Sequence, residues 1–147
     1  MTNFRDKIGN IGFGSMYAQF NGIALSSDEA YQSVLAALHT AMDAGVTLFD
    51  TADIYAPSWD TMGHNEMILR DAVNEWQAPA SAKEELIIAT KGGITRSAGT
   101  AEGSRAPGEV WSKDGSYDYL IRAVEKSAKN LGLSEIPLWQ HHRLDFH

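Results

Sequence analysis

Four short runs of strand-forming residues alternate along this chain with three segments that have the periodicity of helices. The runs cover residues 11–16, 46–49, 86–91 and 136–142. Strands that alternate with helices of a dozen or more residues are typical of right-handed βαβ units, which build a parallel sheet. We therefore predict an α/β fold whose four strands are parallel.

The three helical segments carry recognisable boundary signals. A capping-box pattern begins at Ser26, before the first periodic apolar residues, and Gly45 stands where a left-handed C-terminal cap is expected. The second segment runs roughly over residues 65–76, and the third begins near Ser116 and ends before Gly132. Together with the four strands, these segments predict the order β-α-β-α-β-α-β.

Residues 92–115 predict a long loop, because glycine, serine and threonine are frequent there. Loops longer than about 12–15 residues are usually functional or disordered. The part from Arg96 to Arg105 is therefore expected to be either a binding lid or disordered. Three tryptophans outside the helical segments are candidates for the lining of a substrate pocket: Trp59, Trp111 and Trp139.

The charge balance and the absence of cysteine exclude several functional classes. The 147 residues include 12 Lys and Arg against 19 Asp and Glu, a formal net charge of −7. A nucleic-acid partner is not expected, because no basic stripe is available to neutralise phosphates. Without cysteine the chain has no disulfide, no thiolate nucleophile and no cysteine-bound zinc. His141, His142 and His147 do not predict a metal site, because neighbouring residues on a strand face opposite ways.

No apolar segment predicts export or membrane insertion. The beginning of the chain lacks the apolar core of a signal peptide. No stretch approaches the ~18 consecutive apolar residues that a membrane-spanning helix needs. We therefore expect a cytoplasmic protein without a membrane partner.

Polar residues stand at the ends of three predicted strands. Asp50 closes the second strand, Lys91 the third and His142 the fourth, and Tyr55 follows Asp50 by five residues. Active sites of parallel β/α folds form at the carboxyl ends of the strands. Because side chains alternate along a strand, each strand-end residue can point toward the same side of the sheet.

These four residue types suit one reaction, the reduction of a carbonyl by hydride transfer. Negative charge builds on the carbonyl oxygen, so a proton donor such as the Tyr55 hydroxyl must stand beside it. A neighbouring ammonium, here Lys91, stabilises the phenolate that remains, and a carboxylate such as Asp50 holds the ammonium. An imidazole such as that of His142 adds a hydrogen bond to the oxygen. Taken singly, each residue also has a structural explanation, as a turn cap, a packed aromatic, a solvated charge or a polar strand end.

Longer segments around these residues resemble those of a known family. Residues 45–55 (GVTLFDTADIY), 87–92 (IIATKG) and 138–145 (LWQHHRLD) are similar to signature segments of the aldo-keto reductases. Asn65-Glu66 and residues 130–133 (NLGL) also fall where that family has similar residues. The resemblance runs over nearly the whole chain, and together the segments are highly specific.

The resemblance implies a fold and an extent. Aldo-keto reductases form TIM-type (β/α)8 barrels, so the four strands and three intervening helices expected here would be about the first half of such a barrel. Residues 1–147 would then be a single N-terminal half-domain. The other half of a family barrel would supply the pyrophosphate and adenosine contacts of the cofactor. In half a barrel the first and fourth strands are open edges, so the isolated chain is expected either to self-associate, for example as two half-barrels, or to be only marginally stable.

The resemblance also implies roles for the four polar residues. Tyr55 would be the proton donor and Lys91 the neighbour that makes it a better acid. Asp50 would pair with Lys91, and His142 would orient the carbonyl.

His142 is preferred to His141 because it directly precedes the Arg-x-Asp of residues 143–145, as the family histidine does. The implied cofactor is NADP(H), and the residues expected near its nicotinamide and ribose are Gly14, Ser15, Met16 and Asp50.

Three functional hypotheses remain open at this stage. The chain represents an NADP(H)-dependent reductase of small-molecule aldehydes or ketones, it is a catalytically inactive remnant, or it is a binding or regulatory subunit. The substrate cannot be read from these residues, because one fold serves many substrates and its loops decide among them.

Overall fold

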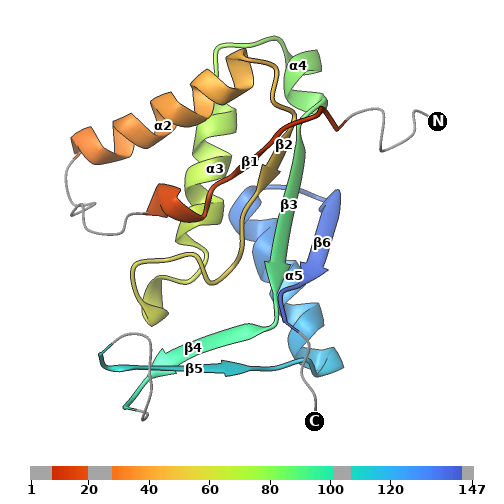
Figure 1. Cartoon of the computed structure of the whole chain (residues 1–147). Coiled ribbons are helices and arrows are strands. Elements are labelled where there is room, and N and C mark those ends of the chain that lie inside the picture. Colours follow the sequence, from red (N-terminus) through yellow and green to blue (C-terminus); the bar gives the residue numbers. More distant parts are fainter. Residues whose placement is uncertain (1–7, 20–27, 101–106, 144–147) are drawn as a thin grey trace.

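A computed structural model of the chain describes residues 8–19, 28–100 and 107–143, and four parallel strands form its central sheet (Figure 1). The strand order is β1-β2-β3-β6, and each neighbouring pair is parallel. The strands are β1 (Gly12–Gly14), β2 (Leu48–Asp50), β3 (Ile87–Gly92) and β6 (Leu138–His141). The predicted fold class, four parallel strands of a partial barrel with intervening helices, is confirmed.

Helices connect these strands in the predicted order. Their bounds are η1 (Met16–Gln19), α2 (Asp28–Asp43), η2 (Trp59–Thr61), α3 (His64–Glu75), α4 (Ala80–Glu84) and α5 (Tyr117–Leu131). The short helix α4 and the two 3-10 turns were not predicted, since such elements are too short to show a periodic pattern.

The predicted helix boundaries agree with the structure where they lie within the described residues. Ser116 caps α5, because its side chain accepts a hydrogen bond from the Tyr119 amide, and Gly132 ends the helix in the left-handed conformation. Gly45 has φ 84°, and its amide donates to the Met42 carbonyl at 3.0 Å. This is the geometry of a glycine that terminates a helix. Ser26 lies outside the described residues.

An apolar layer between the sheet and the helices forms the core. Phe49 of β2 is fully buried, and its ring lies 5.8 Å from that of Phe13 on β1. Burying one such side chain stabilises the fold by roughly 1.5–3 kcal/mol. The buried cluster joins α2, β2, α3, β3 and α5 through Leu35, Leu38, Met42, Phe49, Ile68, Leu69, Ala72, Ile88 and Leu131.

Because side chains alternate along a strand, the neighbours of these core residues face the other side of the sheet. Asp50 follows Phe49 and Gly14 follows Phe13, so both belong to this other side, which is the inner side of the partial barrel. On β3, Ile88 packs into the core and Thr90 bonds to Glu66 of α3, which leaves Lys91 on the inner side. The alternation therefore separates a packed outer face from a polar inner one.

The segment predicted as a long loop over residues 92–115 contains an antiparallel hairpin, so the prediction of a loop without strands is wrong. Strand β4 (Ile94–Ala98) pairs with β5 (Glu109–Lys113), and the hairpin lies beyond the carboxyl end of β3 (Figure 1). Arg96, expected in a lid or a disordered loop, is 8% exposed and forms an ion pair with Glu109. Composition suggested a loop, but cross-strand pairing and this buried contact order the segment. Residues 101–106 lie outside the described part.

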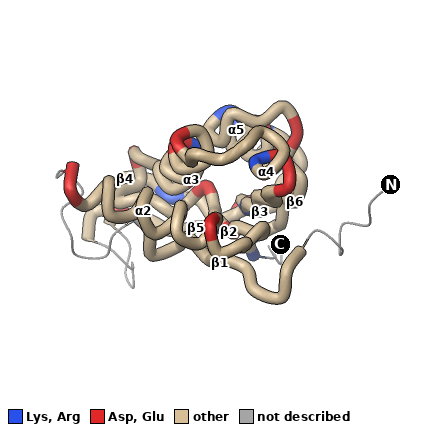
Figure 2. Tube along the Cα trace, turned by 90° about the horizontal axis from the view of Figure 1, so that it is seen from above, with Lys and Arg blue, Asp and Glu red and all other residues tan. Residues whose placement is uncertain are grey.

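Charged positions are distributed over several elements (Figure 2). In this view Lys and Arg lie among acidic positions and form no basic stripe across the described residues. No helix in the described part is both long and apolar enough to cross a bilayer. The same residues contain no group of three or more His, Asp or Glu that could hold a metal ion.

Candidate active site

The register of the parallel strands brings the predicted strand-end residues to one edge of the sheet. Asp50 is paired with Ala89, so Lys91 lies two residues further along the adjacent strand. His142 follows β6 directly, and its amide donates to the Gly92 carbonyl at 2.7 Å. Three side chains that are far apart in the sequence therefore share the carboxyl edge of the sheet.

Lys91 is the centre of the cluster. Its ammonium forms an ion pair with Asp50, with Nζ 2.5 Å from Oδ1, and donates to the Thr51 carbonyl at 2.7 Å. The same Nζ lies 4.9 Å from the centre of the Tyr55 ring. The Lys91 side chain is 11% exposed and that of Asp50 is 39% exposed. The ammonium is thus held between a carboxylate, a carbonyl and a phenol, largely out of water.

The His142 ring also contacts Tyr55. The two rings meet edge to face, with their centres 5.8 Å apart and their planes at 84°. Burial lowers the pKa of His142 to about 4, and the positive charges of Lys91 and Arg143 act in the same direction, whereas Asp50 opposes them. The imidazole is therefore neutral near pH 7. Its Nδ1 is buried without a hydrogen-bond partner among the described residues.

Strand alternation supports the preference for His142 over His141. A Cβ placed on Gly92 would lie 3.1 Å from the Trp139 ring and 3.2 Å from Ala123 of α5, so Trp139 lies on the helix side of the sheet. His141 comes two residues after Trp139, so it belongs to the same side of the strand, and a Cβ on Gly93 would overlap its ring. His142 instead contacts Tyr55 on the inner side. The catalytic role of His142 remains a prediction.

A cleft of about 320 Å³ opens beside Tyr55 and His142. Its lining comes from the segment after β2, from η1, from the hairpin and from the residues after β6. The lining residues are Met16, Ile54, Tyr55, Ala56, Pro57, Ile94, Arg96, Trp111, His142 and Arg143. Such a cleft has the size of a small-molecule site.

Only one of the three tryptophans expected in a substrate pocket lines this cleft. Trp111 contributes to the wall from β5. Trp59 is 41% exposed on η2, and Trp139 packs on the helix side of the sheet, so neither contributes to the wall of this cleft. Tryptophans outside a helix give no local signal of the direction in which they point.

A buried polar network beneath the cluster ties the ends of β1 and β2 to α3. The hydroxyls of Ser15 and Thr51 lie 2.7 Å and 2.6 Å from Oδ1 of Asn65, and Nδ2 of Asn65 donates to the Ser15 carbonyl at 2.9 Å. The Ser15 hydroxyl is also 2.7 Å from the Asp50 carbonyl. Such a satisfied network holds the backbone of Asp50 in place. In the sequence, Asn65 resembles a family residue but carries no signal of this supporting role, which was not predicted.

The residues predicted to lie near the cofactor differ in what they offer. Ser15 is 1% exposed, and its hydroxyl is engaged within the fold. Met16 is 38% exposed and lines the cleft, and a Cβ on Gly14 would meet no atom within 4 Å. Open space at Gly14 beside an exposed Met16 fits the approach of a flat ring such as nicotinamide. Cofactor contacts by these residues remain predictions.

The fold and the strand-edge cluster together define a class of protein. The family model described as "Aldo/keto reductase family" matches residues 10–147. The chain belongs to the aldo/keto reductase family.

Individual relatives agree with this assignment. The chain is 33% identical over 144 residues to "Aldo-keto reductase yakc [NADP(+)]" of Schizosaccharomyces pombe, a match that covers 93% of the chain and 36% of the relative. It is 35% identical over 109 residues to a 6-dehydroglucose reductase of Novosphingobium aromaticivorans, which covers 74% of the chain and 31% of that protein. The chain thus spans about a third of the length of these curated relatives.

Solved structures show the same fold. A glycerol dehydrogenase from Gluconobacter oxydans superimposes with a TM-score of 0.68 at 23% identity, over 95% of the chain and 37% of that protein. At this identity the likeness concerns the fold alone. It shows that the four described strands correspond to part of a complete barrel.

Proposed function

We propose that this chain functions as an NADP(H)-dependent oxidoreductase that reduces aldehydes or ketones to alcohols. One observation carries the proposal: the Lys91 ammonium lies between the Asp50 carboxylate and the Tyr55 ring, and the His142 ring meets the Tyr55 ring edge to face. The family relationship and the relatives named as reductases support the same reaction.

Each of the four residues has a proposed task in carbonyl reduction, and the geometry of the site supports these tasks. A carbonyl oxygen in the cleft would lie beside the Tyr55 hydroxyl, which gives up its proton as negative charge builds on the oxygen. Lys91 stabilises the phenolate that is left, and Asp50 fixes the position of Lys91. His142 is neutral, so it can hydrogen-bond to the oxygen without competing for the proton.

The cofactor is expected beside the ends of β1 and β2. When bound, a reduced nicotinamide supplies the hydride that the protein side chains lack. Gly14 and Met16 would hold the flat ring, and Asp50 would lie near the ribose. NADP(H) is proposed over NAD(H) because the Schizosaccharomyces pombe relative carries NADP(+) in its name.

The test is NADPH oxidation with a panel of aldehydes and ketones, in the wild type and in Tyr55→Phe. Loss of the proton donor should lower kcat by about 10²–10⁴-fold and leave NADPH binding unchanged by fluorescence titration. Tyr117→Phe is the matched control, because Tyr117 is 77% exposed on α5 and lies outside the cleft.

Two results would contradict the proposal. Tyr55→Phe with wild-type kcat would remove Tyr55 from the reaction. Failure of the wild type to bind NADPH at high protein concentration would favour an inactive remnant or a binding subunit instead.

A further inference from the structure

We propose that Arg96 and Glu109 of the β4–β5 hairpin are positioning residues for Tyr55. Neither residue takes part in the transfer of the proton or of the hydride. Their task is to hold the segment over residues 54–59 so that the Tyr55 hydroxyl points at the substrate oxygen. This inference rests on the proposed role of Tyr55, and its test is arranged so that the two can fail separately.

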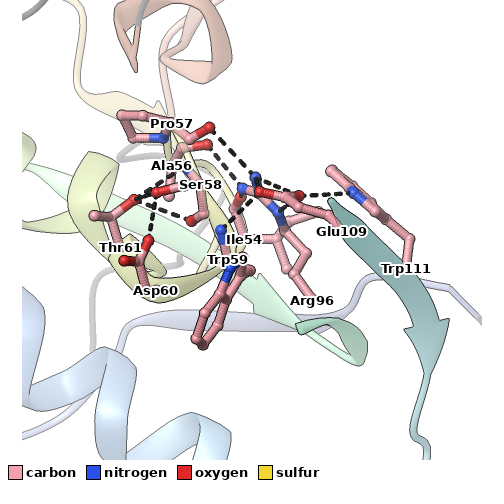
Figure 3. A network of polar contacts seen from close by, with 10 residues as sticks. All are labelled: Ile54, Ala56, Pro57, Ser58, Trp59, Asp60, Thr61, Arg96, Glu109 and Trp111. Atoms are coloured by element: carbon pink, nitrogen blue, oxygen red, sulfur yellow. Dashed lines mark hydrogen bonds and ion pairs between the residues drawn. The ribbon is translucent and has the colours of Figure 1, made fainter. Parts of the chain in front are cut away.

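Arg96 donates hydrogen bonds to the backbone on both sides of Tyr55. Its Nη1 donates to the Ile54 carbonyl at 2.9 Å and to the Ala56 carbonyl at 2.7 Å, and these two residues flank Tyr55 in the sequence (Figure 3). Nη2 reaches the Pro57 carbonyl at 3.5 Å. One guanidinium on the hairpin therefore bonds to a segment that lies forty residues earlier.

Glu109 holds Arg96 and also bonds to the same segment, and we call this pair of residues the clamp. Its two carboxylate oxygens accept from Nε and Nη2 of Arg96 at 2.9–3.1 Å, and its Oε1 also accepts from the Trp59 amide at 2.8 Å (Figure 3). The pair thus bonds to the segment at its beginning and at its end. Arg96 is 8% exposed and Glu109 is 5% exposed. A bidentate pair buried in this way is geometrically specific.

The clamped segment has little other regular structure to hold it. Residues 54–58 form turns and bends between β2 and η2. The amide of Tyr55 donates to the Ala52 carbonyl at 3.2 Å, and its carbonyl accepts from the Asn65 amide at 3.0 Å. Without Arg96, the carbonyls of Ile54 and Ala56 would lose buried partners, because both residues are at most 5% exposed. A displacement of about 1 Å at a reacting group can cost on the order of 10²-fold in rate.

The clamp also joins the segment to the wall of the cleft. The indole nitrogen of Trp111 donates to Oε2 of Glu109 at 3.1 Å, and the Arg96 guanidinium lies 4.7 Å from the indole centre. Arg96 and Trp111 line the same cleft as Tyr55. A ligand that displaces Trp111 would therefore also disturb Arg96 and Glu109, which hold the segment around Tyr55.

The test compares Arg96→Lys, Arg96→Met and Glu109→Gln by steady-state kinetics and by amide hydrogen exchange of residues 54–59. Lysine keeps the charge, but it lacks the planar guanidinium whose separate nitrogens bond to Glu109 and to the two carbonyls. We expect kcat to fall by about 10–10²-fold with KM for the carbonyl changed less than threefold, and exchange in this segment to accelerate. Arg70→Met is the matched control, because Arg70 pairs with Asp71 in an ion pair that is about one third exposed and lies outside the cleft.

A double-mutant cycle with Tyr55→Phe separates positioning from other effects. If Arg96 acts through Tyr55, Arg96→Lys should cause almost no further loss once the hydroxyl is absent. Full additivity, or wild-type kcat and exchange in both Arg96→Lys and Glu109→Gln, would overturn the inference. If Arg96→Met fails to fold, the two conservative variants still decide it. Unchanged activity in Tyr55→Phe alone would instead overturn the proposed function.

Discussion

At the scale of single residues, the environment of His142 decides the charge that the candidate site carries. A folded-state pKa of about 4 lies below the ordinary 6.5, mainly because the ring is buried. The neutral ring contributes stability that is complete above the unfolded pKa and is lost as the pH falls from about 6.5 toward 4. The His142 imidazole of the candidate site should therefore stay uncharged near pH 7.

Proton NMR titration of the His142 ring checks this expectation, with His142→Asn used to assign the resonance. We expect its inflection near pH 4 and no step of the kcat profile that follows this ring near pH 6.5. An inflection at the ordinary imidazole value would show that the ring is solvated and that its contact with Tyr55 is loose.

The pKa of Asp53 is shifted upward, in the opposite direction to that of His142. It is 4% exposed, and burial, reinforced by the charge of Glu66, raises its pKa to about 7 from 3.8, against the weaker effects of Lys126 and Lys91. Between these two pH values the folded protein holds a proton that the unfolded chain has released. The free energy of unfolding should therefore decrease as the pH rises through this window.

Asp53→Asn removes this loss, since an amide has no proton to release. Urea denaturation should show the variant and the wild type nearly equal at about pH 4. At pH 8 the variant should be more stable, by an amount on the order of 4 kcal/mol at most. A difference that does not change with pH would mean that Asp53 is ionised in the fold at all these pH values.

At the scale of elements, the start of α3 depends on a glycine. Gly63 precedes the helix with φ 96°, and a Cβ there would overlap the side chain of Asn130 on α5. Nδ2 of Asn130 in turn donates to the buried Glu66 at 2.8 Å. The close approach of α3 and α5 therefore requires a residue without a side chain at this position.

Gly63→Ala should lower the free energy of unfolding by about 2–4 kcal/mol, from backbone strain of roughly 1–2 kcal/mol plus displacement of a buried polar contact. Gly45→Ala is the matched control, because φ is 84° there but no atom lies within 4 Å of the added Cβ. Chemical denaturation of both variants measures the difference. Equal losses would show that Asn130 moves aside without cost.

At the scale of the whole molecule, the sheet ends in two unpaired edges among the described residues. Strands β1 and β6 are the outer strands of the order β1-β2-β3-β6. Ile11 and Tyr17, which flank β1, are 72% and 71% exposed. Exposed edges with apolar neighbours favour pairing with another chain.

We predict that a polypeptide of these 147 residues self-associates, and sedimentation velocity over a range of concentrations measures this. Ile11→Lys should weaken the association, because a charge beside an edge strand opposes pairing. Tyr117→Lys, a substitution at an equally exposed site on α5, should not. A monomer at every concentration, with cooperative melting, would contradict the prediction.

Local sequence signals determined much of this protein. Helix caps such as Gly45 and the alternation of strands with helices depend on residues close together in the chain, and both agreed with the structure. The gathering of Asp50, Lys91 and His142 also followed from sequence, because parallel strands place their carboxyl ends at one edge.

Only the tertiary structure decided what holds Tyr55. Arg96 bonds to carbonyls forty residues earlier and to a carboxylate across a hairpin that composition had suggested was a loop. The direction in which Trp139 points, and the support of Ser15 and Thr51 by Asn65, were likewise invisible. Periodicity reports which face of an element is buried, whereas the partner of a buried polar group is chosen by packing between distant segments.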